Sequence, residues 1–334
     1  MDLTTVADDE AVFHDGTTVH AHRGLAPDTE HNLRGMRFRT LPRPGELLCR
    51  FATVNDVHFG ETEAGIIGGV ETTPLRAAEG AAPYPETMNR AAVAEIAQIE
   101  PEVVLAKGDL TDEGTREEYG AFLECYGDAF GDRLVHIRGN HDAYLGQDFV
   151  PAGPFRVDVP GARLLMIDTT VPHQAGGSVA AETLTWLDDQ AAGADVPVLV
   201  FGHHHPWSPD SATRSESYFG IDPDASEALV DVVANRPEIV GYFAGHTHRN
   251  RVRHFTATGA LPWVEVACVK DFPGSWAEYR VFEGGVLQIH RRISSPSALE
   301  WSEACRDLYR GVIDYPAYAM GDLSDRCFAI PARS

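Results

Sequence analysis

Two histidines, His246 and His248, stand two positions apart directly after an apolar run at residues 239–244. On an extended segment, side chains at positions i and i+2 point to the same side. Imidazole is the commonest metal ligand among side chains. The pair therefore indicates two nitrogen ligands at the end of a buried strand, placed so that each reaches a different metal ion.

Side chains of similar chemistry follow four other apolar runs. Asp56 and His58 follow the first run in the chain, and Asp109 follows the second. The remaining candidates at such positions are Asn140, His141, Asp142, His203, His204 and His205. In open α/β sheets, ligands bind outside the carboxyl ends of the strands, so we expect these side chains to meet at one sheet edge.

Carboxylate, amide oxygen and imidazole together suit divalent first-row metals better than calcium or a thiolate site. Two aspartates, one asparagine and four histidines are too many ligands for one tetrahedral zinc. They fit two ions that share one bridging carboxylate. Two ions about 3.5–4 Å apart are a recurrent arrangement for in-line displacement at phosphorus.

The elements that must position these residues alternate along the chain. Apolar runs of strand length lie at 47–54, 102–106, 134–138, 163–167, 197–201 and 238–244. Helix-like segments lie at 86–100, 115–126, 180–192 and 224–235, with Thr87 and Asn89 as N-cap candidates for the first. Buried strands separated by helices predict α/β architecture with parallel strands.

Shorter strand-like runs follow residue 250, and we expect them to pair in an antiparallel manner. The predicted fold is a four-layer αββα sandwich, classed as α/β (α+β), in which two mixed sheets pack together with helices outside. Residues 1–46 are predicted to be a β appendage, 47–293 the main domain and 294–334 a C-terminal extension. Within the appendage, the stretch GLAPDTEHNLR resembles part of a fibronectin type III module, with His31 at the corner-tyrosine position.

Composition excludes several classes of partner. The formal net charge of −23 argues against nucleic acid and against an anionic membrane surface. The acidic N-terminus lacks the regions of a signal peptide, and no apolar stretch approaches the ~20 residues of a membrane span. Five cysteines without a C-x-x-C motif favour a reduced, cytoplasmic protein. A homodimer stays open.

The order D-x-H, G-D, G-N-H-D, G-H-H and G-H-T-H resembles the calcineurin-like metallophosphoesterase superfamily over roughly residues 47–290. Each motif alone is weak, but five in order after strand-like runs are specific. The resemblance implies that Asp56, His58 and His248 bind one ion, and that Asp109 bridges two. It implies that Asn140, His204 and His246 bind the second. The ions would be two of manganese, iron, zinc or magnesium.

The triple histidine at 203–205 leaves one ligand open. The family pattern places the ligand two residues before a proline, so Pro206 selects His204. A one-residue slip would select His203, which on a strand would face the other way. His205 is a candidate for substrate contact.

The resemblance also implies a catalytic pair. His141 would lie over the phosphate, where it stabilises charge or protonates the leaving oxygen after attack by metal-bound hydroxide. Asp142 would orient the His141 ring by a hydrogen bond. Asn140 and His141 are thus also predicted to contact the substrate. Asp112 and Glu113 are interpreted as loop charges or helix-entry residues.

The function favoured by the resemblance is hydrolysis of small phosphodiesters of the cyclic-nucleotide or glycerophosphodiester type. The alternatives are a phosphomonoesterase or nucleotide pyrophosphatase of the same superfamily, and a scaffold that keeps the fold without catalysis. The connection at 60–85, with its five glycines, is our candidate for a lid that selects the substrate.

Overall fold

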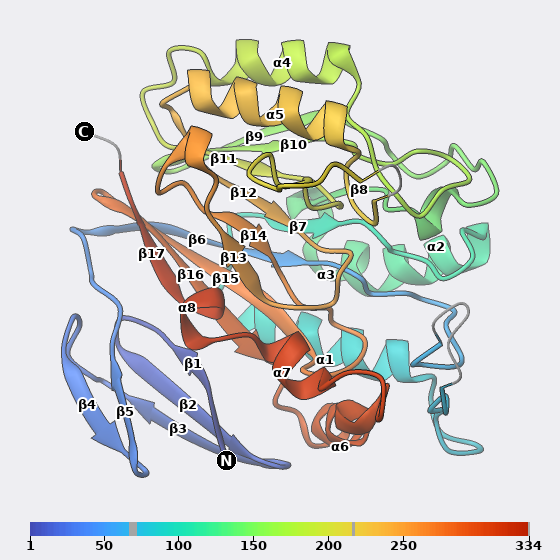
Figure 1. Cartoon of the computed structure of the whole chain (residues 1–334). Coiled ribbons are helices and arrows are strands. Elements are labelled where there is room, and N and C mark those ends of the chain that lie inside the picture. The colour runs from blue at the N-terminus through green and yellow to red at the C-terminus, as the bar shows by residue number, and fades with distance from the viewer. Residues whose placement is uncertain (67–71, 216–217, 333–334) are drawn as a thin grey trace.

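Two six-stranded β-sheets pack face to face in the computed structural model, which describes residues 1–66, 72–215 and 218–332. Helices cover both outer faces, so the layers follow the order helix, sheet, sheet, helix (Figure 1). The predicted four-layer sandwich is confirmed. Each sheet contains both parallel and antiparallel pairs, as the sequence also predicts.

The first sheet has the order β17-β16-β15-β6-β7-β8. Its strands are β6 (Leu47–Val54), β7 (Val104–Lys107), β8 (Leu134–Ile137), β15 (Ser275–Phe282), β16 (Gly285–Arg292) and β17 (Phe328–Pro331). The pairs β6-β7 and β7-β8 are parallel, because a helical crossover joins each strand to the next. The carboxyl ends of these three strands therefore share one edge.

The second sheet has the order β13-β14-β12-β11-β10-β9. Its strands are β9 (Phe155–Val159), β10 (Ala162–Met166), β11 (Val198–Phe201), β12 (Ile239–Ala244), β13 (Arg251–Arg253) and β14 (Trp263–Glu265). The antiparallel pairing expected after residue 250 is confirmed for β13-β14, β15-β16 and β16-β17, but β14 also pairs with β12, and that pair is parallel. The chain leaves β12, forms the edge strand β13 and returns between them, so β14 takes the direction of β12.

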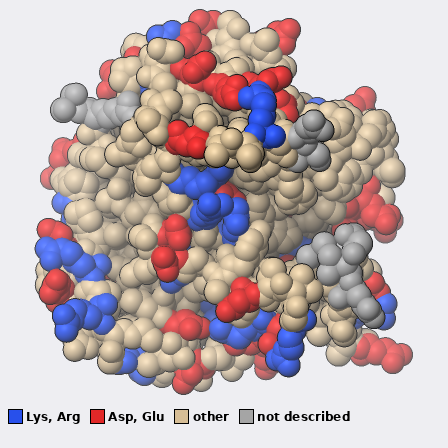
Figure 2. All heavy atoms as spheres, in the orientation of Figure 1, with Lys and Arg blue, Asp and Glu red and all other residues tan. Residues whose placement is uncertain are grey.

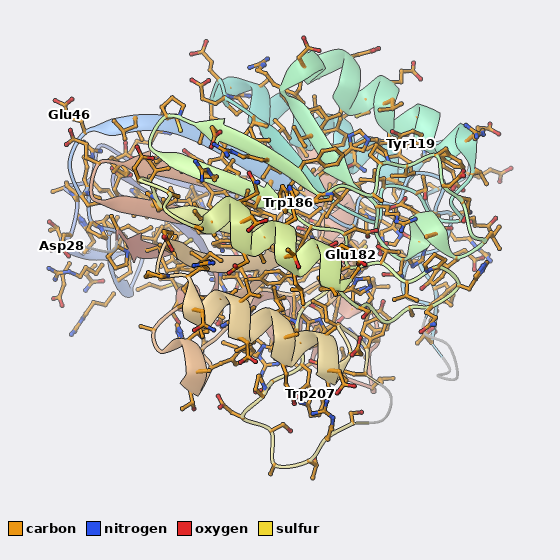
Figure 3. The ribbon with its side chains drawn as sticks, turned by 90° about the horizontal axis from the view of Figure 1, so that it is seen from above. Asp28, Glu46, Tyr119, Glu182, Trp186 and Trp207 are labelled. Carbon is orange, nitrogen blue, oxygen red and sulfur yellow. The ribbon has the colours of Figure 1, made fainter. Side chains whose placement is uncertain are left out.

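Helices cover the two sheets separately. The longer ones are α1 (Tyr84–Gln98), α2 (Arg116–Phe122), α4 (Ala181–Ala191), α5 (Pro223–Asn235) and α6 (Pro296–Ala304). Short helices follow at α3 (Asp128–Phe130), α7 (Tyr315–Met320) and α8 (Leu323–Arg326). In Figure 3, α4 carries Glu182 and Trp186 and lies over the second sheet, while Tyr119 of α2 lies on the other side of the molecule.

The predicted N-cap of the first helix is wrong. Helix α1 begins at Tyr84 after Pro83, with Pro85 in its first turn, so Thr87 and Asn89 lie inside the helix. A proline is tolerated at this position because its missing N–H has no partner there in any helix. The Asn89 side chain instead donates to the Val57 carbonyl at 2.9 Å, which ties α1 to the loop after β6.

Apolar side chains fill the space between the layers. Phe51, Phe201 and Tyr279 meet between the two sheets, with the Phe51 and Tyr279 rings parallel and 4.5 Å apart between centroids. Separate apolar clusters lie under α1 and α2 and under α4 and α5. Both faces of the central strands are thus buried, which explains their near-continuous apolar sequence.

The N-terminal residues form two small sheets beside the sandwich. The strands are β1 (Asp2–Val6), β2 (Glu10–Asp15), β3 (Thr18–Arg23), β4 (Glu30–Leu33) and β5 (Met36–Arg39). Thr5 donates to the His290 carbonyl of β16 at 2.8 Å. The buried Arg280 of β15 pairs with Asp8 and Asp9, so charged contacts as well as packing hold these sheets in place. The domain boundaries and the fibronectin resemblance stay predictions.

Charged side chains are mixed on the face shown in Figure 2, where lysine and arginine lie in small groups among aspartate and glutamate. No helix in the described part of the chain is long and apolar enough to cross a membrane. All five cysteines are free and buried.

Candidate metal centre

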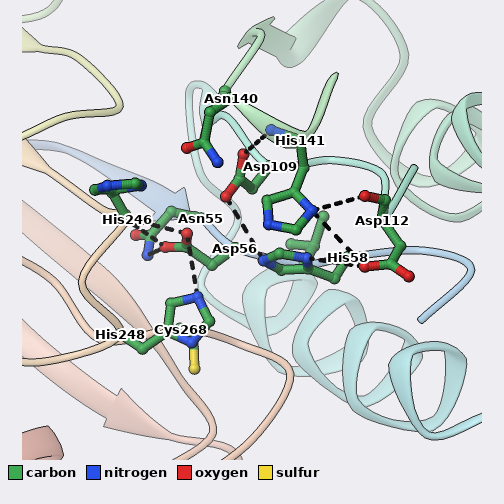
Figure 4. A network of polar contacts seen from close by, with 12 residues as sticks. Asn55, Asp56, His58, Asp109, Asp112, Asn140, His141, His246, His248 and Cys268 are labelled. Carbon is green, nitrogen blue, oxygen red and sulfur yellow. Dashed lines mark hydrogen bonds and ion pairs between the residues drawn. The ribbon is translucent and has the colours of Figure 1, made fainter. Parts of the chain in front are cut away.

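The candidate ligands come from five strand ends that meet where the two sheets adjoin. In the first sheet, Asp56 and His58 follow β6, Asp109 follows β7 and Asn140 follows β8. In the second sheet, the histidine triplet at 203–205 follows β11, and His246 and His248 follow β12. Figure 4 shows side chains from both sheets turned toward a common centre.

Ligand atoms in this centre lie close enough to share metal ions. Within each of four overlapping groups they all lie within 4.8 Å of one another. The groups are Asp56–His58–His248, His58–Asp109–His141, Asp56–Asp109–His203 and His203–His204–His246. The structure thus brings the predicted aspartate and histidine ligands together.

The state of the imidazoles fits a metal site. Both ring nitrogens of His58 and the Nε2 atoms of His204 and His246 are buried without a hydrogen-bond partner among the described residues. An unpaired buried polar atom is costly, and a metal ion would satisfy these clustered ring nitrogens. Burial holds the pKa of these three rings well below the usual range. They are therefore neutral at pH 7, which is the form that binds a metal ion.

Asp109 lies between the two halves of the centre. Its Oδ2 atom is 3.7 Å from His58 Nε2 and 3.3 Å from His203 Nε2, while its Oδ1 atom accepts from the His141 N–H at 2.9 Å. Burial acts to raise the pKa of this carboxyl, but the His203 and His141 rings hold it well below its usual range. Asp109 is thus ionised, and its carboxylate adjoins both halves of the centre.

An unusual backbone presents these side chains. Ten non-glycine residues of the described chain have positive φ, and five of them are predicted ligands: Asp56, His58, Asp109, His246 and His248. Such conformations cost energy and cluster at functional sites. Glycine also permits the close approach, because a Cβ atom on Gly245 would lie 2.7 Å from the Asp56 carboxylate. The loops therefore accept strain in order to aim their side chains inward.

A sequence model of the family described as calcineurin-like phosphoesterase matches residues 49–250, which is more than half of the chain and spans every strand end described above. The chain is a calcineurin-like phosphoesterase. The family consists of hydrolytic phosphoesterases, and the resemblance seen in the sequence is thereby confirmed.

Several curated relatives of this phosphoesterase are named as phosphodiesterases. A glycerophosphodiester phosphodiesterase of Enterobacter lignolyticus is 32% identical over 44% of this chain and 56% of its own length. A 3',5'-cyclic-nucleotide phosphodiesterase of Nostoc is 25% identical over 63% of this chain and 76% of its own length. A cAMP/cGMP dual specificity phosphodiesterase of Mycobacterium tuberculosis is 25% identical over 65% of each chain.

The fold has a counterpart among solved structures. A dimetal phosphatase from Danio rerio superposes with a TM-score of 0.53 at 15% identity, over 74% of this phosphoesterase and 97% of that chain. At this identity the similarity establishes the fold alone.

The triple histidine does not behave as a simple strand end. The expectation that His203 would face away is wrong: its ring lies 4.7 Å from the His204 ring and 5.1 Å from the His246 ring, between centroids. Its Nδ1–H donates to the Lys107 carbonyl, and its Nε2 atom lies 3.0 Å from Asn140 Oδ1. The chain leaves the extended conformation after β11, so alternation no longer holds. Since the Nε2 atom of His204 lacks a partner and that of His203 has one, the geometry favours His204 as the ligand.

His141 is oriented by a contact that the sequence did not indicate. Its Nδ1–H donates to the Asp112 backbone carbonyl at 2.6 Å. The prediction that Asp142 orients the His141 ring by a hydrogen bond is therefore wrong. Asp142 is fully buried and accepts from the backbone N–H groups of Leu110, Thr111 and Gly139. It therefore joins the loop that carries Asp109 to the loop that carries Asn140. A backbone acceptor leaves no trace in residue type, so this contact was not predictable.

Replacing Asp142 by asparagine is expected to lower the free energy of unfolding by about 2–4 kcal/mol, because an amide cannot accept from all of these buried donors. A fall in the thermal midpoint together with weaker metal binding would be measured by calorimetry and titration. Asp148→Asn, on an exposed carboxylate of the same loop, is the control and is expected to change neither quantity. An unchanged midpoint in Asp142→Asn would contradict the joining role.

Other residues differ from their predicted roles. His205 is 4% exposed and packs against Tyr218, with 5.2 Å between ring centroids, and it does not line the cavity beside the centre. Its predicted contact with substrate finds no support. Asp112, interpreted as a loop charge, lies 3.8 Å from His58 Nδ1. Burial raises the pKa of its carboxyl to about 6.

Two supporting residues were missed. Asn55 donates through its amide to the Val266 carbonyl at 3.0 Å and to the Asp56 carboxylate, so it fixes that ligand. Asp271 lies 3.7 Å from His248 Nδ1, on the side of the ring opposite the metal centre. Asn55 precedes a ligand in the sequence and could have been suspected. Asp271 lies 23 positions from His248, and no sequence spacing links the two.

Proposed function

We propose that this chain hydrolyses small phosphodiesters with the help of two divalent metal ions. The observation that carries the proposal is the set of neutral, unpartnered imidazole nitrogens around the ionised Asp109, at the end of a cavity of about 440 Å³. The ligand sets are those implied by the family resemblance. Asp56, His58 and His248 would hold one ion; Asn140, His204 and His246 would hold the other, with Asp109 between them.

When bound, such ions supply positive charge to the phosphoryl oxygens and lower the pKa of water. The remaining chemistry falls to the chain itself. A carbonyl only accepts hydrogen bonds, so the His141 Nδ1 atom must be protonated and donates to the Asp112 carbonyl. The Nε2 atom of His141 is therefore left for the cavity that the ring lines. In the protonated ring, Nε2–H can donate to a phosphoryl oxygen or give its proton to the departing oxygen.

A diester is favoured over a monoester by the shape of the site. The cavity extends from the metal centre past Tyr144, Phe219 and Tyr318, which leaves room for organic groups beyond the phosphate. A monoester has one such group and a diester has two. The relatives named as phosphodiesterases support the same choice. Manganese, iron, zinc and magnesium are the candidate ions, and a cytoplasmic location is proposed from the free thiols.

Metal removal is the direct test. Protein treated with a chelator is expected to lose its activity toward bis(p-nitrophenyl) phosphate. Reconstitution with one of the four candidate metals is expected to restore that activity. In the same assay p-nitrophenyl phosphate, a monoester with the same leaving group, is expected to react more slowly. Full activity in chelator would contradict the proposal. A protein that binds two ions per chain without hydrolysing either ester would favour a scaffold.

A further inference from the structure

The cavity beside the metal centre has two unlike ends. The inner end carries the metal-centre side chains together with Glu61 and Lys270, which form a buried ion pair with an N–O distance of 2.6 Å to Glu61 Oε2. The outer wall is aromatic and aliphatic. Its members are Ile66, Tyr144, Phe219, Tyr309, Ile313 and Tyr318, and the buried Tyr315 also lines the cavity. Because Glu61 and Lys270 are already paired with each other, the apolar wall determines which organic groups of a substrate the cavity can bind.

Much of this wall comes from the C-terminal extension, beyond the residues matched by the family. Hydrogen bonds hold the extension in place: the Tyr315 hydroxyl donates to Asp271 at 2.6 Å, and the Tyr318 hydroxyl donates to the Thr247 carbonyl at 3.0 Å. Asp271 and Thr247 adjoin the metal centre in sequence or in space. The wall is therefore fixed relative to the site of chemistry.

Tyr309 stands out within this wall. Its φ angle is 60°, which is unusual for a bulky side chain and marks a backbone held by its surroundings. Its ring meets the Tyr315 ring edge to face, with centroids 4.8 Å apart. The ring is thus supported from behind while it lines the cavity.

Large apolar side chains are also exposed at this cavity. Ile66 is 60% exposed, Phe219 57% and Ile313 41%, and all three line it. The Phe219 ring lies 4.0 Å from the His246 ring, between centroids, so an apolar face reaches the edge of the metal centre. Exposed apolar groups around a site that also holds polar groups are typical of ligand binding.

We propose that Tyr309, Ile313 and Phe219 form a subsite for a planar aromatic group carried by the phosphodiester, either a nucleobase or an aryl ring. The proposal rests on the proposed function and specifies the substrate class. Flat aromatic faces stack on tyrosine and phenylalanine. A glycerol group offers no such face. Among the described residues that line the cavity, the only charged groups beyond the metal-centre residues are Glu61 and Lys270, which are bonded to each other. The extension therefore selects aromatic over polyol substrates.

Competitive inhibition tests the selection with probes that share one phosphate. Adenosine 5'-monophosphate, phenyl phosphate and ribose 5-phosphate would be compared as inhibitors of bis(p-nitrophenyl) phosphate hydrolysis by the metal-loaded protein. At least one of the two aromatic probes, adenosine 5'-monophosphate and phenyl phosphate, is expected to bind ~10-fold more tightly than ribose 5-phosphate. Preference for adenosine 5'-monophosphate alone indicates a nucleobase, and preference for both indicates any aryl ring. Equal inhibition by all three would overturn the proposal.

Variants locate the effect. Tyr309→Ala and Phe219→Ala are each expected to weaken inhibition by the aromatic probes ~5-fold or more, with inhibition by ribose 5-phosphate unchanged, so the advantage of the aromatic probes over ribose 5-phosphate falls. Tyr309→Phe keeps the ring and is expected to keep the advantage. Leu123→Ala, at an exposed apolar position that does not line this cavity, is the control. An advantage that persists in both alanine variants would refute the assignment.

Failure of the two proposals can be told apart. If the wild-type protein hydrolyses no phosphodiester, the proposed function fails. Titration calorimetry with adenosine 5'-monophosphate and ribose 5-phosphate would then still report whether the ring is bound. If the protein hydrolyses diesters but binds the two probes equally, only the aromatic subsite fails.

Discussion

Replacing His141 by alanine is expected to lower kcat for bis(p-nitrophenyl) phosphate by ~10²–10⁴-fold while both metal ions stay bound. The reason is positional. The side chain is 28% exposed and lines the cavity, and because its Nδ1–H is bonded to the Asp112 carbonyl, its Nε2 atom is left for the cavity. The sequence resemblance does not make this residue a ligand. Its loss should therefore remove a proton donor and leave the metal centre assembled.

A series of leaving groups separates this role from a structural one. Diesters with poor leaving groups need protonation of the departing oxygen most, so they are expected to lose the largest factor in His141→Ala. His173→Ala is the matched control, because His173 is exposed on a neighbouring loop and its ring donates from Nδ1–H to the Tyr144 carbonyl at 2.9 Å. Loss of metal from His141→Ala, or an equal loss for every leaving group, would show that the role is misassigned.

The sequence predicted the elements that form the floor of the site because each leaves a strong local pattern. The strands β6, β10, β11 and β12 are buried on both faces, and their apolar runs coincide with the predicted segments to within one or two residues. Parallel strands bring their carboxyl ends to one edge, so polar residues at those ends could be predicted to meet. Topology thus turned a one-dimensional pattern into a cluster.

The parts that were not predicted depend on loops and on pairing between distant segments. His203 turns inward because the chain bends after β11, and period-two alternation predicts the opposite. The Asp112 contact is made by a backbone carbonyl. The aromatic wall requires Tyr309 and Tyr318 to pack against residues more than 50 positions earlier, such as Thr247. No spacing rule connects such segments, since tertiary packing alone decides them.

The structure describes only part of the candidate lid at 60–85. Glu61 and Ile66 of the connection at 60–85 line the cavity, which agrees with a role in substrate selection. Residues 67–71 of the same connection lie outside the described residues. The wall assigned above to the C-terminal extension shares this role, so substrate choice is expected to depend on both segments.

Replacing Asp109 by asparagine is expected to have the broadest effect of any single change. Mutation of a residue that only supports a metal ligand typically lowers metal affinity or activity 10–100-fold. Removal of a bridging carboxylate should therefore lower both metal affinity and activity by more than ~100-fold. An amide keeps the shape of the side chain but removes the charge and one acceptor oxygen. The His58 and His203 rings beside it then face an N–H₂ group or an uncharged oxygen, and neither half of the centre keeps its shared anion.

Elemental analysis and kinetics on the same preparation check this expectation. Asp109→Asn is expected to lose both ions, since a shared ligand belongs to both sites, whereas His248→Ala is expected to lose one first. Asp112→Asn is the matched control: its carboxylate lies 3.8 Å from His58 Nδ1, close to the centre but outside the implied ligand set, so both ions should remain. Two ions per chain and wild-type turnover in Asp109→Asn would mean that no carboxylate bridges the ions. The two halves would then be independent sites, and charge from Asp56 alone would have to hold the first.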